Sequence, residues 1–304
     1  MSPEPNSSTL MSPTHVVLGT RDRSAQVEWW TALGFTAGPT TPVPAIEAAA
    51  LYGLNGPTTQ TLMSVHGATA GHILLVDTNQ MPAAVGPWDR GPHAIDLYTV
   101  DMQRSLAIAA AAGGRVKGCL KYDFGTMVLE EGKSIGPDSS VLVFIENSKR
   151  RPSILDTFPE RLHSEVHSIV NIVGSVDAAR RAWIECAGME LLGDAVIDSP
   201  ELADLMELPK VVSARMGLFC DDAVAPIRFE FLEFVGLDDG EGDDLEQWPL
   251  RPGLPMALFT VSDLDIAMSR LAAGGFCFGD VVLKANGRRG VCGTDPAGLR
   301  FQLG

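Results

Sequence analysis

The segment HVVLGTRDRSAQVEWWTALGF (15–35) follows a plan that recurs three more times along the chain. It reads as a strand of about six residues, a polar turn, an amphipathic helix and then a glycine. The recurrences are AIDLYTVDMQRSLAIAAAAGG (94–114), HSIVNIVGSVDAARRAWIECAGM (167–189) and MALFTVSDLDIAMSRLAAGG (256–275). Four copies of one strand–turn–helix unit therefore organise the chain.

Copies one and three are more alike than neighbouring copies, and so are copies two and four. The first and third carry tryptophans in the helix (Trp29, Trp30, Trp183), whereas the second and fourth both end in Ala-Ala-Gly-Gly. His15 and His167 stand half a chain length apart. This pattern indicates that a unit of two modules was duplicated.

Short β-type runs follow each helix, and the last run of each module is the clearest. These last runs are GHILLVD (71–77), SVLVFIE (140–146), IRFEFLEF (227–234) and GLRFQLG (298–304). In the third of them, Phe229 and Phe231 alternate with Glu230 and Leu232, the period of two that a strand covered on one face shows. Each module is therefore predicted to be βαβββ with its helix on one sheet face, which makes the fold α+β.

Proline-rich and charged segments suggest the domain boundaries. We expect a disordered tail at 1–12 and an N-terminal lobe at 13–148, with modules 13–80 and 90–148. A linker at 149–163 then leads to a C-terminal lobe at 164–304, with modules 164–236 and 252–304. The acidic segment 237–247 is expected to be a solvated loop between modules three and four.

Composition excludes several classes of function. The 304 residues carry a formal net charge of −15, and the densest basic run is only Lys149–Arg151, so nucleic acid is not an expected partner. The chain lacks an apolar stretch of about 18 residues, a signal peptide, a P-loop, a nucleophile elbow and a dinucleotide fingerprint. Five cysteines without zinc spacing indicate reduced thiols in a cytoplasmic protein. A small molecule is the expected partner, and a homodimer is left open.

The chain resembles the vicinal oxygen chelate superfamily, which includes glyoxalase I, bleomycin-resistance proteins, methylmalonyl-CoA epimerase and extradiol dioxygenases. The resemblance rests on HVVLGTRD followed by WWTALGF, on FEFLEF, and on the turn GTDPAGLRFQL near the end of the sequence. It implies that paired modules curve into two half-barrel lobes with the helices outside. We expect modules one with two and three with four to pair; one with four and two with three is the alternative known in the family.

The resemblance also implies a divalent metal on the concave face, held by a His from a module's first strand and a Glu from its last strand. The matching first-strand and last-strand positions are His15 and Leu74, Ile95 and Val143, Ser168 and Glu230, and Met256 and Gln302. His93 lies near the second set, and His167 is one residue out of register unless a bulge intervenes. No pair of modules supplies a complete ligand set. Modules three and four would offer His167, Glu230 and Gln302, and modules two and three would offer His93, His167 and Glu230, with Glu146 nearby. His167 and Glu230 are therefore the expected ligands of any metal.

Candidate site residues follow from the same positions. Glu230 sits among apolar neighbours, so its carboxylate is a candidate base or ligand, or else part of an ion pair with Arg228 or Arg300. We expect acid–base roles for His167 and His15, and substrate contacts from Gln302, His93, Trp88 and Trp248. The helix tryptophans are expected to pack in the core.

Two functions of different class are compatible with these residues. The first is an enzyme that abstracts a proton beside a carbonyl of a small, oxygen-rich metabolite, as an isomerase, lyase or cyclase does. The second is a protein that binds an antibiotic or drug-like molecule without chemistry. An extradiol-type dioxygenase is a third reading, with an incomplete His, His, Glu triad. We favour the enzyme.

Overall fold

The computed structural model describes residues 12–86, 88–124, 127–208, 212–220, 227–236, 245 and 247–304. The tail predicted at 1–12, apart from Ser12, lies outside these residues. The same holds for the acidic segment 237–247, apart from Leu245 and Gln247.

Four modules follow one another along the chain, as predicted. Module one consists of β1 (Pro13–Thr20), α1 (Arg23–Ala32), β2 (Thr36–Val43), α2 (Ala45–Tyr52), β3 (Thr58–Ser64) and β4 (His72–Asp77). Module two consists of β5 (Gly91–Thr99), α3 (Met102–Ala111), β6 (Arg115–Phe124), β7 (Met127–Ile135) and β8 (Val141–Asn147), with a 3-10 turn at Pro137–Ser139.

The third and fourth modules repeat this plan after the short helix α4 (Ile154–Thr157). Module three consists of β9 (His163–Ile172), α5 (Val176–Arg180) with a π-helical continuation (Arg181–Cys186), β10 (Glu190–Ile197), α6 (Pro200–Met206), β11 (Ser213–Cys220) and β12 (Arg228–Val235). Module four consists of β13 (Pro255–Phe259), α7 (Leu264–Ala273), β14 (Cys277–Phe278), β15 (Val282–Leu283), β16 (Arg289–Thr294) and β17 (Arg300–Leu303). Modules one and three each carry an extra helix, α2 or α6, that the βαβββ plan did not predict.

The same local signals start and end the helix of every module. The side chains of Asp22, Asp101, Ser175 and Asp263 each accept a hydrogen bond from a backbone N–H in the first turn of the following helix. A glycine with positive φ follows each helix, at Gly34, Gly113, Gly188 and Gly275. Only glycine adopts this conformation without strain, so the glycine of the repeat sets the turn into the next strand.

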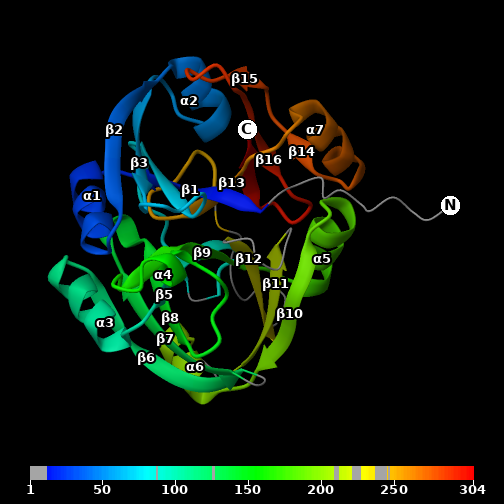
Figure 1. Ribbon diagram of the computed structural model, residues 1–304. Coiled ribbons are helices and arrows are strands. Elements are labelled where there is room, and N and C mark those ends of the chain that lie inside the picture. Colours follow the sequence, from blue (N-terminus) through cyan, green and yellow to red (C-terminus); the bar gives the residue numbers. More distant parts are fainter. Residues whose placement is uncertain are drawn as a thin grey trace.

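The two sheets correct the expected pairing of modules. One sheet has the strand order β14-β16-β17-β13-β1-β4-β3-β2, with β15 paired to β16, and combines modules one and four. The other has the order β10-β11-β12-β9-β5-β8-β7-β6 and combines modules two and three. We call them the terminal and the central half-barrel; Figure 1 shows them one above the other. The preferred pairing of one with two and three with four was wrong, and the alternative is right.

The pairing was predicted wrongly because sequence similarity between two modules shows that they share a fold, but does not show that they lie side by side in one sheet. The first strands of the modules meet antiparallel, β1 with β13 and β5 with β9, so the central half-barrel forms from consecutive modules in the middle of the chain. The segment 149–163, predicted to link two lobes, instead joins β8 to β9 within one sheet and contains α4.

One apolar core joins the two half-barrels and the helix layer. Trp183, at the end of the α5 helix, has its ring centroid 4.9 Å from that of Phe229 in the central sheet and 5.7 Å from that of Phe259 in the terminal sheet. Its Nε1 donates a hydrogen bond to Asp295 over 2.9 Å, in the GTDPAG turn. The helix tryptophans are buried, as expected. The helices α1, α3, α5 and α7 thus pack in this shared core, outside the concave faces, whereas α2 and α6 lie over the concave faces.

Candidate functional site

Each half-barrel holds a cavity on its concave face, and the candidate residues divide between the two. His15 and Gln302 line the cavity of the terminal half-barrel. His93 and Glu230 line the cavity of the central half-barrel. The chain therefore presents two separate sites rather than one.

Two β-bulges place histidines on the concave face of the central sheet. Between β5 and β9, Pro92 faces Asn171 and Ala94 faces Val170, so His93 is an extra residue in β5. Further along the same pair of strands, Asp96 faces Ser168 and Leu97 faces Val166, so His167 is an extra residue in β9. The bulge on which the position of His167 depended is therefore present.

Three carboxyl groups converge on the central cavity. Asp96 comes from the middle of β5, Glu131 from β7 and Glu230 from β12. Ser168 Oγ donates a hydrogen bond to Oε2 of Glu230 over 3.2 Å. The hydroxyl of Tyr122 donates to Oε1 of Glu131 over 2.6 Å. Phe229 and Phe231, on either side of Glu230 in the strand, pack against Trp183 in the helix layer, as their alternation predicted.

Burial raises the pKa of all three carboxyl groups, and repulsion by neighbouring carboxyl groups adds to the effect for Asp96 and Glu131. The pKa of Glu131 is raised to about 7, chiefly by burial; Tyr122 and Arg228 oppose the rise, and Glu230 adds to it. Burial raises the pKa of Asp96 well above its ordinary value, and the carboxyl groups of Glu230 and Glu131 add to this effect. The pKa of Glu230 is also raised by burial, against the attraction of Arg228. At neutral pH this cluster therefore holds protons that exposed carboxyl groups would release.

Apolar side chains close the central cavity. Leu202 and Met206 of α6 cover it, and its volume is about 40 Å³, enough for a few water molecules. His93 and Lys133 also line it, and both ring nitrogens of His93 are buried without a partner among the described residues. Burial lowers the pKa of His93 to about 3 and that of Lys133 to about 8.

His167 is held beside the carboxyl cluster by two contacts. Its ring stacks on Tyr98, with centroids 3.8 Å apart and planes 6° apart. Its Nδ1 lies 3.0 Å from Nη2 of Arg228, while Nε2 has no partner among the described residues. Burial, and the charges of Arg228 and Arg151, lower the pKa of His167 well below its ordinary value. The ring is therefore neutral at physiological pH.

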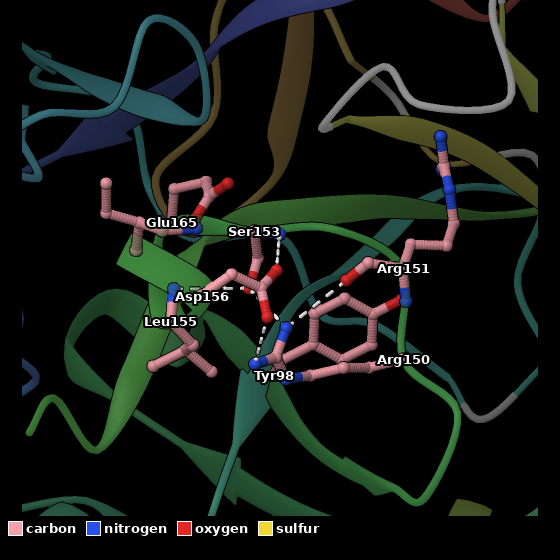
Figure 2. A network of polar contacts seen from close by, with 8 residues as sticks. Tyr98, Arg150, Arg151, Ser153, Leu155, Asp156 and Glu165 are labelled. Atoms are coloured by element: carbon pink, nitrogen blue, oxygen red, sulfur yellow. Dashed lines mark hydrogen bonds and ion pairs between the residues drawn. The ribbon is translucent and has the colours of Figure 1, made fainter. Parts of the chain in front are cut away.

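The segment before β9 fixes the position of Tyr98 (Figure 2). The backbone N–H of Arg151 donates to the Tyr98 hydroxyl over 3.4 Å. Arg150 donates to Asp156 over 2.7 Å, and Ser153 and Asp156 form a capping box at the start of α4. These contacts, several of them exposed, orient the ring on which His167 rests.

The residues of the central cavity do not fit the divalent metal that the resemblance implies. Asp96, and not the predicted Ile95, takes the first-strand position of module two. The other three family positions hold Val143, Ser168 and Glu230, as predicted, and valine offers no ligand atom. The guanidinium of Arg228 already lies beside His167 and lowers the pKa of Glu230, as a bound cation would. Among the described residues, no group of three or more His, Cys, Asp or Glu is arranged to hold a metal. A metal on His167 and Glu230 stays an untested prediction.

The terminal cavity is larger and differently lined. Its volume is about 550 Å³, and the predicted family positions His15, Leu74 and Gln302 lie on its walls. The predicted position Met256 does not; Leu258, which faces His15 in the neighbouring strand, lines the cavity instead. Gln302 Nε2 donates to the backbone carbonyl of Leu51 over 3.0 Å, at the end of α2. The amide of Gln302 thus ties α2 to β17.

The two loop tryptophans lie beside the cavities and not in their described walls. Trp88 packs on the apolar cluster of the central half-barrel. Trp248 packs in the terminal half-barrel under Arg300, whose guanidinium carbon is 4.4 Å from the ring centroid. Arg300 therefore belongs to the terminal half-barrel, away from the Glu230 cavity.

Sequence reasoning missed four residues of the central cavity: Asp96, Tyr122, Glu131 and Lys133. Asp96 stands between Ile95 and Leu97 as Glu230 stands between Phe229 and Phe231, so the argument used for Glu230 would have found it. The family alignment instead placed Ile95 at this position, and Ile95 packs in the core. Glu131 and Lys133 lie on the same face of β7. The residues around them are mostly polar, so no alternation of apolar and polar residues marked these two as facing a cavity.

Comparisons with known proteins agree with this architecture. No family model matches the chain, and no curated protein matches it in sequence. Glyoxalase I from Zea mays superposes with a TM-score of 0.65 at 13% identity, over 96% of this chain and 91% of that one. A protein from Bacillus subtilis, described as a dioxygenase, superposes with a TM-score of 0.63 at 10% identity, over 97% of this chain and 84% of that one. None of the described helices is long and apolar enough to cross a membrane. The chain therefore has a glyoxalase-like fold, built here from four modules.

Proposed function

We propose that the protein is an enzyme that moves a proton on the carbon beside a carbonyl group of a small, oxygen-rich metabolite, with the central cavity as its active site. The observation that carries the proposal is the convergence of Asp96, Glu131 and Glu230 on one closed apolar cavity. A protein gains no stability from three buried carboxyl groups that repel one another. Such groups are arranged in this way where a proton has to be held and transferred.

Asp96 and the pair of Glu131 and Glu230 have different chemical roles in this proposal. Burial raises the pKa of Asp96 well above its ordinary value and so favours its protonated form, and its Oδ1 has no partner among the described residues. A neutral carboxyl group of this kind donates a hydrogen bond to a carbonyl oxygen and stabilises the negative charge that develops there. The pair of Glu131 and Glu230 then accepts the proton from the adjacent carbon. Since Glu131 titrates at about pH 7, the pair is partly ionised under physiological conditions.

The residues around the carboxyl groups hold the glutamate side chains in position. Tyr122 and Ser168 each donate a hydrogen bond that fixes one oxygen of a glutamate and leaves the other for the substrate. Arg228 offsets part of the negative charge. The helix α6 covers the cavity, so its outward displacement admits the substrate and its return excludes water.

The test is hydrogen–deuterium exchange at carbon. Small α-hydroxy and α-keto carbonyl compounds are incubated with the protein in D₂O, and loss of the C–H signal beside the carbonyl is followed by NMR. We expect exchange with at least one compound, reduced about 10²- to 10⁴-fold by Glu131→Gln or Glu230→Gln. Glu130→Gln is the matched control, because Glu130 is the neighbour of Glu131 on the opposite face of β7 and lines a different surface.

Two results would contradict the proposal. One is the absence of exchange for every compound, and the other is exchange that survives both substitutions. In either case the second candidate, a binding protein without chemistry, becomes the better explanation. The terminal cavity of about 550 Å³ favours that candidate, because it has the size of a small-molecule site.

A further inference from the structure

The terminal cavity gathers positive charge in a protein that is strongly acidic overall. Lys284 and Arg288, from the turn between β15 and β16, reach its wall, where His15 also lies. The ring of His72 is 5.3 Å from that of His15, and Nδ1 of His72 is buried without a partner in the described part of the chain. The whole chain carries a net charge of −15, so this local excess of basic groups is not a consequence of composition.

These basic groups repel one another. The pKa of His15 is lowered to about 4, chiefly by burial, and His72, Lys284 and Arg288 contribute to the same shift. Burial and Arg288 also lower the pKa of Lys284, whereas Glu47 acts in the opposite direction. A cluster that disfavours its own charges gains free energy when a negative group binds between them.

Among the described acidic side chains, only Glu47 lines this cavity, and it offsets the basic cluster in part. Glu47 lies in the cavity wall, but its Oε2 accepts a hydrogen bond from the backbone N–H of Ala285 over 2.8 Å and so holds α2 against the turn. Neither Lys284 nor Arg288 forms an ion pair with a described side chain. By contrast, the adjacent Arg289 points elsewhere and forms two contacts of 2.8 Å with Asp265.

The rest of the wall suits an organic molecule and not a bare ion. Leu62, Leu74 and Leu258 supply apolar surface, while Tyr52 and Gln60 form a hydrogen-bonded pair with their polar atoms 3.2 Å apart. A volume of about 550 Å³ accommodates a molecule of about the size of a substituted benzene ring or larger.

We propose that the terminal half-barrel is a second ligand site, which binds a small organic anion with its carboxylate or phosphate group between Lys284 and Arg288 and its apolar part against the leucine wall. This site is independent of the proposed active site. The central cavity is lined by carboxyl groups and so disfavours the same ligand.

Thermal melting and calorimetric titration test the proposal on the full chain, in a buffer free of phosphate and carboxylates. The probes are phenyl phosphate, benzoate and phenol, which share a ring and differ in charge. We expect the two anions to raise the melting temperature and to bind saturably at one site per chain, and phenol to bind at least tenfold more weakly. The stronger of the two anions identifies the acidic group of the natural ligand.

Variants distinguish this site from the other one. Lys284→Ala and Arg288→Ala should each weaken binding of the anions at least tenfold, whereas Arg289→Ala, whose side chain is paired with Asp265, should leave binding unchanged. The proposal is wrong if neither anion binds saturably, if phenol binds as tightly as benzoate, or if Arg289→Ala weakens binding as much as Lys284→Ala. Loss of anion binding in Glu131→Gln would place the site in the central half-barrel and would also overturn it. Failure here leaves the exchange experiment on the central cavity unaffected.

Discussion

The hydroxyl of Tyr122 donates a hydrogen bond of 2.6 Å to Glu131, from the neighbouring strand of the same hairpin. This bond favours the ionised carboxylate and so opposes the rise in pKa that burial causes. The balance of the two effects leaves the pKa of Glu131 at about 7. Tyr122 is therefore a positioning residue whose removal has a defined effect on proton affinity.

Tyr122→Phe should raise the pKa of Glu131 further. A hydrogen bond to a charged group contributes about 1.5–3 kcal/mol, which corresponds to a shift of about one to two pH units. The acidic limb of the pH–rate profile for exchange should move to higher pH by that amount. A ¹³C NMR titration of the glutamate carboxyl groups measures the same shift without a substrate. An unchanged titration in the variant would contradict this assignment.

The raised pKa of Glu131 also predicts how stability depends on pH. The folded protein holds this proton up to about pH 7, whereas the unfolded chain releases it near 4.5. The contribution of Glu131 to stability is thus fully present below pH 4.5 and is lost as the pH rises through 7. The shift corresponds to a loss of roughly 3 kcal/mol relative to Glu131→Gln, which cannot ionise. Urea unfolding of both proteins at pH 4.5 and 8 measures the difference; parallel pH dependences would contradict it.

The fold was predictable because its signals are local and repeated. A side-chain cap before each helix and a glycine after it, as at Asp101 and Gly113, act within a few residues and recur in all four modules. The pairing of modules was not predictable in the same way, because it depends on which first strands meet, and β5 and β9 are far apart in the chain. The sequence predicted Glu230 and its orientation correctly from alternation with Phe229 and Phe231.

The rest of the candidate site depends on features that alternation does not reveal. His93 and His167 reach the concave face through bulges, and an extra residue changes the face to which the neighbouring side chains belong. Glu131 comes from a strand with no alternating apolar pattern, and its proximity to Asp96 depends on the order β5-β8-β7 in the sheet. Sequence reasoning therefore identified one carboxyl group of three.

Substitution of His93 tests how much the unpaired polar groups of the site lower the free energy of unfolding. Both ring nitrogens are buried without a partner among the described residues, which costs about 1–3 kcal/mol for each unsatisfied group. His93→Leu removes these groups at similar volume, so we expect the free energy of unfolding to rise by about 1–2 kcal/mol at pH 7. The gain should be larger at pH 4, because burial lowers the pKa of His93 to about 3 and the unfolded chain is protonated there. A loss of stability in denaturant unfolding would show that His93 has a partner in solution.

Metal dependence can be tested directly. Because Arg228 already supplies a positive charge beside His167 and Glu230, we expect metal analysis of protein purified without chelator to give less than one equivalent per chain. EDTA should leave the melting temperature and the exchange rate unchanged. One equivalent of Fe, Ni, Zn or Mn that is lost in Glu230→Ala would show instead that His167 and Glu230 bind a metal and that Arg228 yields its place.

Glu230→Gln separates a functional from a structural role for this carboxylate. The amide oxygen of glutamine can still accept the hydrogen bond from Ser168, and the repulsion with Asp96 disappears. The favourable interaction with Arg228 is lost at the same time. We therefore expect the free energy of unfolding at pH 7 to change by less than about 1 kcal/mol, or to rise, while carbon exchange is lost.

Glu233→Gln is the control on the same strand. Glu233 lies outside the cavity, and its carboxylate accepts a hydrogen bond of 2.8 Å from the backbone N–H of Val176 at the start of α5. Loss of this charged cap should cost about 0.5–2 kcal/mol and leave exchange intact. If Glu230 were instead held in a structural ion pair with Arg228, then Glu230→Gln would leave a buried guanidinium unpaired and cost about 3–5 kcal/mol. A loss of that size, with exchange retained in the folded fraction, would show that the carboxylate stabilises the fold and takes no part in proton transfer.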